Sequence, residues 1–417
     1  MWRLPTLDGS TTIGSMNQPS SAATTLLHVP LPADAPPGVY VHVPFCRHIC
    51  PYCDFNTYSG QEALVPRYVA ALLEEMRLLV RAEPERAGRG APTLFFGGGT
   101  PSLLPAADVA RLIEGSRAHF GLRTDAEVTL EANPESVDAA YLEGIRAAGV
   151  NRLSLGVQSQ RRAGLRVLGR GHKSLEAGQA FMAAREAGFE NISLDFIYGW
   201  PGQTADDWEA DLATLLEWQP EHVSLYALIV EPGTPLHAAV QRGILTPVED
   251  DRVADFHERA LEVLAAAGWE HYEIANWARE PRYRSRHNQL YWQNSDYFGL
   301  GAGAHFHHGN LRGGNLLLPA AYCTAVERGE LPRMATETLS ADTALGESLM
   351  LGLRLLVDGV GADDIRARHG VDLAATYAAE IARFTALSLL EWHAGSRLRL
   401  TPRGALLANE VCAAFLR

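Results

Sequence analysis

The sequence lacks any apolar run long enough to cross a bilayer, so we expect a protein that is not itself transmembrane. It also lacks an excess of positive charge: 36 Lys and Arg residues stand against 49 Asp and Glu residues, a formal net charge of −13. Tight binding to a nucleic-acid backbone needs clustered cations, so we expect no nucleic-acid partner. Residues 1–37 show neither a basic start before an apolar block nor an Arg-rich amphipathic pattern. We therefore predict a cytoplasmic protein with a disordered tail over residues 1–37.

Cysteine is scarce, with five residues in 417, and three of them fall within eight positions: Cys46, Cys50 and Cys53. A disulfide scaffold would have a denser and more even distribution of cysteines. The cluster instead indicates a reducing compartment and a metal site. Cys323 and Cys412 are isolated in the sequence and are interpreted as small buried apolar residues.

Short apolar runs alternate with helical patterns after the tail. The predicted strands are Val39–Val43, Thr93–Phe96, Glu127–Glu131, Arg152–Val157, Ile192–Ile197 and Val223–Ile229. The predicted helices are Val65–Val80, Pro105–His119, Asp138–Ala148, Leu175–Ala187, Ala205–Glu217 and Glu249–Ala267. Such alternation implies right-handed crossovers and a parallel sheet. We predict an α/β fold with a curved, barrel-like sheet whose site lies at the carboxyl ends of the strands.

The pattern changes at about Tyr272, where Gly, Asn, His and aromatic residues become frequent. Helices follow, then a short strand at Ser396–Leu400 and a last helix at Gly404–Phe415. We therefore predict a barrel over residues 38–271 and a smaller, mostly helical C-terminal region over residues 272–417, of winged-helix type.

The three clustered cysteines have the spacing C-x3-C-x2-C, directly after the first predicted strand. Three thiolates on one loop can hold three irons of a [4Fe–4S] cluster. The fourth iron would keep an open position at which a ligand can chelate the metal. A zinc site that combines these cysteines with His48 or His42 is the alternative.

This loop resembles the signature of the radical S-adenosylmethionine (SAM) superfamily. The resemblance implies a partial (β/α)6, TIM-like barrel, a site-differentiated [4Fe–4S] cluster and bound SAM, whose reductive cleavage yields a 5′-deoxyadenosyl radical. The run Gly97-Gly98-Gly99-Thr100 after the second strand resembles the motif for the methionine moiety of SAM. Glycines suit that task because the backbone itself must approach the ligand.

From about residue 38 the chain resembles the branch that contains oxygen-independent coproporphyrinogen III oxidase and the HemW haem chaperones. That resemblance implies SAM contacts at Tyr40, Gly98, Gly99, Thr100, Glu131, Gln158, Arg170, Asp195 and Ala227. Structural alternatives exist for several of them. Glu131 and Asp195 could cap helices, Arg170 could be a surface cation, and Tyr40 could pack in the core.

Two features distinguish the oxidase from the HemW-type proteins within this branch. The oxidase carries an extra cysteine two residues after the third ligand, where this sequence has Phe55. HemW-type proteins carry the motif His-Asn-x-x-Tyr-Trp, which matches residues 287–292 here. The resemblance implies haem binding, with His287 as a candidate iron ligand. The alternative is that His287 is a hydrogen-bonded structural residue; His305, His307 and His308 are further candidates, of which His305 could instead lie near SAM.

These observations favour a haem chaperone that binds the cluster, SAM and haem, and passes haem to respiratory proteins at the membrane. Such a protein would have SAM-cleaving capability without being a coproporphyrinogen III oxidase, and it could form a homodimer. Oxidative decarboxylation of coproporphyrinogen III is the second hypothesis, and Phe55 counts against it. A radical SAM enzyme for RNA or another small molecule is the third, and the negative charge counts against RNA.

Overall fold

The computed structural model describes residues 35–416. Most of the predicted disordered tail, residues 1–34, therefore lies outside the described residues. None of the helices over residues 35–416 combines the length and the apolar character that crossing a membrane requires.

All six predicted strands form and lie side by side in one sheet, each parallel to its neighbours. They are β1 Gly38–Val43, β4 Thr93–Gly98, β5 Glu127–Ala132, β6 Arg152–Gln158, β7 Ile192–Tyr198 and β8 His222–Ala227. Their residues are almost entirely buried, as expected for strands covered on both faces. The prediction of an α/β fold with a parallel, radical-SAM-type sheet is thus confirmed.

The sheet is not closed, and strands from later in the sequence extend it at both edges. On the β1 side, β11 Tyr297–Leu300 is parallel to β1, and the antiparallel strands β12 His305–His308, β13 Leu311–Gly314 and β14 Glu337–Thr338 follow. On the β8 side, β10 Asn276–Ala278 and β9 Glu270–Glu273 are antiparallel. Strands from both sides of residue 272 therefore share the main sheet, and the domain boundary at that residue stays a prediction.

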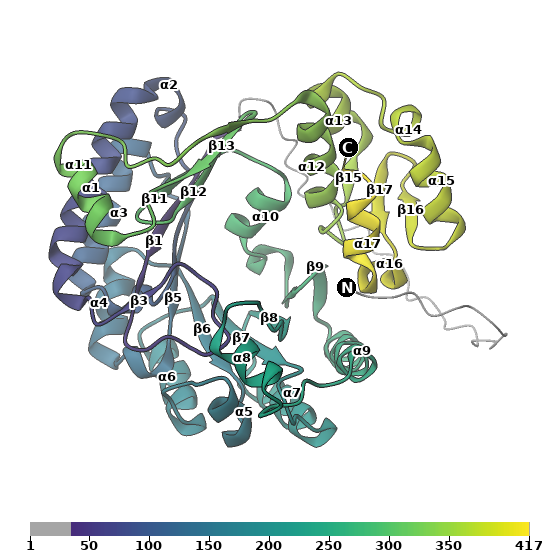
Figure 1. The fold of residues 1–417 in the computed structure, drawn as a ribbon, viewed down its shortest axis with the longest axis horizontal. Helices are drawn as coiled ribbons and strands as arrows, with labels where there is room; N and C mark the ends of the chain where they lie inside the picture. Colours follow the sequence, from purple (N-terminus) through teal and green to yellow (C-terminus); the bar gives the residue numbers. More distant parts are fainter. Residues whose placement is uncertain (1–34, 417) are drawn as a thin grey trace. The chain divides into compact units, whose positions relative to one another are not determined.

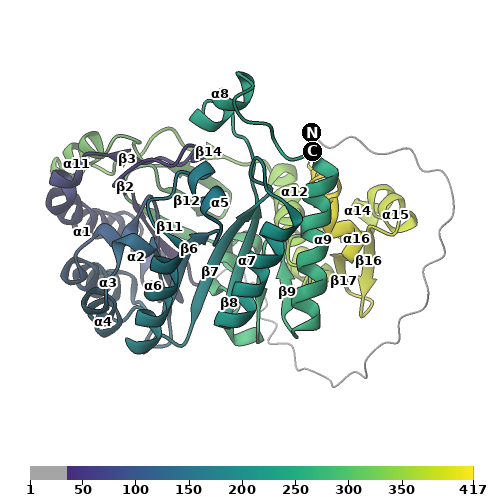
Figure 2. The ribbon, with the colours of Figure 1, turned by 90° about the horizontal axis from the view of Figure 1, so that it is seen from below.

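The predicted helices form with ends shifted by at most two residues. They are α1 Val65–Ala82, α3 Ala106–Phe120, α4 Ala139–Ala148, α6 Ser174–Glu186, α7 Ala205–Trp218 and α9 Asp250–Ala266. Helices α1, α3, α4 and α6 succeed one another along one face of the sheet (Figures 1 and 2). Local sequence fixes several starts: Asp138 accepts a hydrogen bond from the Tyr141 amide, and Thr204 accepts one from the Asp207 amide.

A short helix, α10 Arg286–Trp292, lies on the opposite face of the sheet (Figure 1). Its N-terminal amides at Arg286 and His287 donate to the carboxylate of Glu127, at 3.0 and 2.9 Å. An acidic side chain at a helix start satisfies amides that have no partner within the helix. The first residue of β5 thereby fixes α10 against the inner face of the sheet.

The C-terminal region has its own apolar core, which includes Leu349, Tyr377, Phe384, Leu398 and Val411. Its elements are α12 Ala341–Gly352, β15 Val360–Gly361, α13 Ala362–His369, α14 Leu373–Thr376, α15 Ala378–Ala386, β16 Leu390–His393, β17 Arg397–Leu400, α16 Pro402–Leu406 and α17 Ala408–Ala413. The predicted strand is confirmed as β17. The predicted last helix is two short helices, because Leu407 leaves the helical conformation.

Candidate functional site

A cavity of about 400 Å³ lies at the carboxyl ends of strands β4 to β8 and beside the cysteine loop. Eleven predicted site residues line it: Cys46, Cys50, Cys53, Gly98, Gly99, Thr100, Glu131, Gln158, Arg170, Asp195 and Ala227. They come from positions up to 181 residues apart in the chain, and the parallel sheet brings them to one edge. Tyr40 and His287 are predicted site residues that do not line this cavity.

The backbone of the glycine run is joined to the cysteine loop. The Gly99 amide donates to the Val43 carbonyl at 2.8 Å, and the Thr100 amide donates to the Phe45 carbonyl at 2.9 Å. A Cβ atom at Gly99 would lie 2.8 Å from the Phe45 carbonyl oxygen and 3.0 Å from the Cys46 sulfur. Only glycine permits this approach, which places the loop amides and the thiols on one wall of the cavity.

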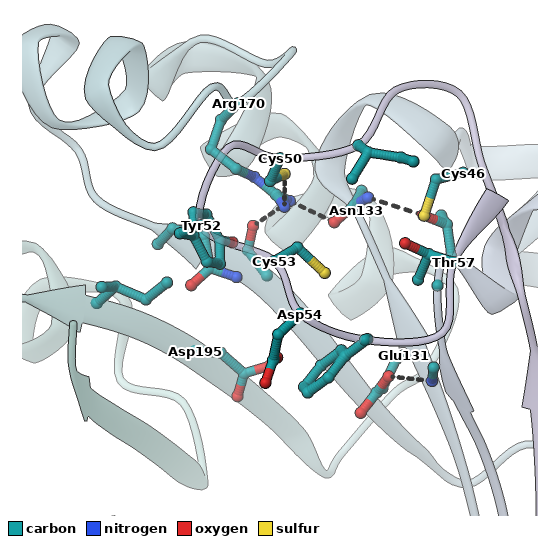
Figure 3. Close-up of a pocket in the computed structure, with 18 of the residues that line it drawn as sticks. Cys46, Cys50, Tyr52, Cys53, Asp54, Thr57, Glu131, Asn133, Arg170 and Asp195 are labelled. Carbon is teal, nitrogen blue, oxygen red and sulfur yellow. Dashed lines mark hydrogen bonds between the residues drawn. The ribbon is translucent and has the colours of Figure 1, made fainter. Parts of the chain in front are cut away.

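Arg170 links the cysteine loop to the strands. Its guanidinium donates to the Cys50 sulfur at 3.6 Å, to the Gly156 carbonyl at 3.0 Å and to the Asn133 side-chain oxygen. Figure 3 shows Arg170 beside Cys50, with Glu131 and Asp195 farther along the same cavity. Gly156 has no side chain, which leaves room for Arg170, Gln158 and Asn133 to pass over the strand. The cation is half-buried and hydrogen-bonded within the site, so the surface-cation alternative for Arg170 is wrong.

Burial disfavours ionisation of two of the three clustered thiols. Burial raises the pKa of Cys46 and of Cys53, although hydrogen bonds from Thr100 and from the Phe55 backbone oppose this effect. The hydroxyl of Thr100 donates to the Cys46 sulfur at 3.5 Å. A bound metal centre deprotonates its thiol ligands, so this site favours thiolates when positive metal charge is present.

The arrangement of possible ligands bears on the zinc alternative. Over residues 35–416, no three Cys, His, Asp or Glu side chains converge on a position for one metal ion. Mononuclear zinc needs such a position, whereas the thiolates of a cubane cluster bind different irons. Both ring nitrogens of His42 are paired, with the Tyr40 hydroxyl and the Asn56 carbonyl at 2.9 Å each. His48 has its Nε2 at 3.0 Å from the Gly169 carbonyl. The three thiols therefore fit a [4Fe–4S] cluster better than zinc.

Two buried carboxyl groups line the cavity opposite the loop. Glu131 accepts a hydrogen bond from the Gly98 amide at 3.2 Å, and Asp195 accepts one from the Ser154 hydroxyl at 2.9 Å. Burial, and next the charge of Asp195, raise the pKa of Glu131 to about 8. Burial also raises the pKa of Asp195. Neither group caps a helix; both face a cavity where a cationic ligand would favour their ionised forms.

The remaining predicted SAM contacts occupy strand ends or the strand interior. Gln158, the last residue of β6, has a φ of 64°, an uncommon conformation for a residue with a side chain. Ala227 ends β8. Tyr40 lies within β1, where its hydroxyl is 2.9 Å from His42 Nδ1 and its ring stacks on Phe95. Tyr40 therefore contacts His42 and Phe95 and does not line the cavity.

His287 is buried on the inner side of α10, at 1% exposure. Its Nδ1 is 2.7 Å from the Thr93 hydroxyl and its Nε2 is 2.9 Å from the Tyr291 hydroxyl. Burial, and next the positive charge of Arg152, lower its pKa to about 3. Both ring nitrogens thus have protein partners, as expected if His287 is a hydrogen-bonded structural residue. No nitrogen of His287 is available to haem iron in this conformation.

Sequence analysis did not assign Asn133 or Ser154 to the site, although both line the cavity. Ser154 precedes Gly156 by two positions on β6, and residues two apart share a face of a strand. That periodicity could have identified Ser154. Asn133 follows β5 directly, so its place at the end of a strand was the available signal.

Comparisons with known proteins agree with this architecture. Residues 40–215 match the family model of the radical SAM superfamily, and residues 339–407 match that of the HemN C-terminal domain. The chain is 41% identical to the heme chaperone HemW of Mycobacterium tuberculosis, over 93% of this chain and 96% of that protein. It is 37% identical to the heme chaperone HemW of Bacillus subtilis, over 91% and 99% of the two chains.

A solved structure supports the fold. The coproporphyrinogen III oxidase HemN from Escherichia coli superposes with a TM-score of 0.78 over 92% of each chain, at 24% identity. At this identity the similarity concerns the fold alone. A radical SAM domain implies a [4Fe–4S] cluster and SAM, and the cavity contains the residues expected for both.

Proposed function

The chain belongs to the HemW family of radical SAM proteins, and we propose that it is a haem chaperone that binds a [4Fe–4S] cluster, SAM and haem. The observation that carries this proposal is identity of 41% over nearly the full length of a heme chaperone HemW. Family membership was predicted from the cysteine spacing and the motif at residues 287–292. The fold alone would not distinguish a haem chaperone from an enzyme, since one fold hosts several activities.

Within this proposal, the cluster is held by Cys46, Cys50 and Cys53. When bound, it supplies the electron that cleaves SAM. Gly98, Gly99 and Thr100 line the space for the methionine moiety of SAM, and Glu131 attracts a cationic group of SAM. Asp195, Gln158 and Ala227 line the part of the cavity nearest the later strands. Arg170 fixes the cysteine loop through Cys50, and Tyr40 orients the first strand.

We further propose that the protein works in the cytoplasm and delivers haem to haem-accepting respiratory proteins at the membrane. The test is an anaerobic haem titration of cluster-reconstituted protein, followed by absorbance, and then incubation with a haem-free respiratory acceptor in membranes. Saturable binding of one haem per chain, followed by transfer to the acceptor, is the expected result. Weak, non-saturating binding would contradict the proposal.

The second candidate is oxygen-independent coproporphyrinogen III oxidase, which the superposition on HemN favours at the level of the fold. Phe55 stands where that enzyme carries an additional cysteine. Its side chain is exposed and lines the cavity. A decarboxylation assay with coproporphyrinogen III, SAM and a reductant separates the two functions, and we expect no loss of CO2 from the substrate.

A further inference from the structure

The antiparallel edge formed by β12 and β13 presents histidines on both of its faces. His305 is paired with Gly314, and His307 with Arg312. Alternate residues of a strand face opposite sides, so His305 and His307 share one face and His308 lies on the other. The three histidines are nearly adjacent in sequence but do not all lie on the same face of the sheet edge.

Of these three histidines, His305 is the one with no partner within residues 35–416 at either ring nitrogen, whereas His307 and His308 each have a paired Nδ1. His307 is buried, with Nδ1 3.2 Å from the Ser295 carbonyl. His308 has Nδ1 3.6 Å from the carboxylate of Glu83. His305 is exposed, and within residues 35–416 neither of its ring nitrogens has a hydrogen-bond partner. An unpaired, exposed imidazole is the form in which histidine binds a metal.

A thioether lies beside this imidazole. The Met334 amide donates to the Gly314 carbonyl at 2.8 Å, which holds Met334 next to β13. A Cβ atom at position 314 would lie 3.4 Å from the Met334 methyl carbon and 3.5 Å from His305 Nδ1. Met334 is 38% exposed. Both side chains therefore lie against Gly314, whose backbone is itself buried.

We infer that His305 and Met334 bind haem iron; this inference rests on the proposed function and adds its site. Histidine and methionine together form a known axial ligand pair of haem iron. The methionine side chain is flexible and polarizable, so it can adjust to a planar ligand. The site is open to solvent, so an acceptor protein can reach bound haem. His287 offers neither access nor an unpaired nitrogen.

The test is a haem titration of the full-length, cluster-reconstituted chain with His305→Leu and Met334→Leu variants. His308→Leu, on the opposite face of the same strand, is the matched control. We expect His305→Leu to weaken haem binding roughly 10-fold or more, the cost that loss of even an outer-shell partner typically brings. Met334→Leu should remove the charge-transfer band that ferric haem shows with a sulfur ligand. The control should match the unmodified protein.

The outcomes separate the site from the function. Saturable binding that both variants leave unchanged, in affinity and spectrum, overturns the His305 and Met334 site while the chaperone function stands. Equal weakening by His308→Leu and His305→Leu also overturns the site, because binding would then not depend on the face of the strand. Absence of saturable haem binding by the unmodified chain overturns the proposed function and the site together.

Discussion

The guanidinium of Arg170 is a half-buried cation that contacts the cysteine loop. Arg170→Met removes its hydrogen bonds to Cys50, Asn133 and Gly156 and leaves the Asn133 oxygen without this donor. We expect lower iron and sulfide content after reconstitution and SAM binding weaker by about tenfold, or about 1.4 kcal/mol. Arg170→Lys should fall between, since lysine keeps the charge without the planar fork. Full cluster content and unchanged SAM affinity in Arg170→Met would contradict the role given to Arg170.

Glu131 should make SAM binding depend on pH. Because its pKa is raised to about 8, chiefly by burial, the carboxyl group is largely protonated at neutral pH and ionises as pH rises. Only the ionised form attracts a cationic ligand. We expect the ratio of wild-type to Glu131→Gln affinity for SAM to rise by up to about tenfold per pH unit below pH 8.

Calorimetric titration of both proteins at pH 6.5, 7.5 and 8.5 measures this ratio. Titration of SAM itself affects both proteins equally and cancels. A constant ratio would show that Glu131 does not face the bound cation.

At the residue scale, sequence patterns and the family resemblance identified cavity residues such as Glu131 in β5 and Asp195 in β7. They could not locate the conformation of Gln158 or the path of Arg170. The positive φ of Gln158 and the contacts of Arg170 with Cys50 depend on how the strand ends, the cysteine loop and α5 Arg162–Val167 meet in space. The spacing of residues in the sequence does not show how these segments pack together.

At the element scale, α10 shows how a motif's surroundings decide its role. The hexapeptide at residues 287–292 was a candidate haem site, yet the helix packs against β4 and its N-terminal amides donate to the carboxylate of Glu127. Glu127 lies 160 residues from His287 in the sequence, and Thr93 of β4 lies 194 residues from it. The six core strands were predictable because each is a short run rich in apolar residues that alternates with a helical pattern, and several are nearly continuously apolar. The place of β11 beside β1 was not, because strands of four residues carry little pattern.

The burial of α10 yields a prediction for His287. Replacement by alanine leaves a cavity and removes the partner of the Thr93 and Tyr291 hydroxyls. We expect the free energy of unfolding to fall by about 2–4 kcal/mol, with haem affinity unchanged in the folded protein. Urea denaturation and haem titration measure the two quantities. A stable variant that has lost haem binding would restore His287 as the iron ligand.

At the scale of the whole molecule, several acidic groups are buried with raised pKa values. Burial raises the pKa of Glu75, Asp211 and Glu273 to about 7 each, and that of Glu131 to about 8. Glu273 is fully buried in β9, at a bridge to Leu355 near the start of the C-terminal region. Within the described residues, its oxygens have no well-aligned hydrogen bond, although Trp292 and Asn276 lie near.

These groups predict how stability changes with pH. A carboxyl group whose pKa is higher in the folded than in the unfolded protein binds more protons when folded, so stability falls as pH rises through the folded pKa. Buried histidines act in the opposite direction below pH 6.5: burial lowers the pKa of His271 and His369 to about 4 and that of His287 to about 3. In the unfolded protein these histidines are half protonated at pH 6.5 and become almost neutral about one pH unit higher, so their opposing effect is small over the rest of the range. Stability should therefore decline from pH 6.5 to 8.5.

Glu273→Gln measures how much the carboxyl group of Glu273 contributes to the decline in stability. With a folded pKa of about 7, Glu273 accounts for about 0.8 kcal/mol of the stability lost between pH 6.5 and 8.5. Urea denaturation at both pH values should show a decline smaller by this amount in Glu273→Gln. Glu262→Gln, at an exposed side chain of α9, should keep the full decline. If Glu273→Gln and Glu262→Gln lose equal stability over this range, the carboxyl group of Glu273 is ionised in the folded protein, and cations near it such as Arg354 must then offset its burial.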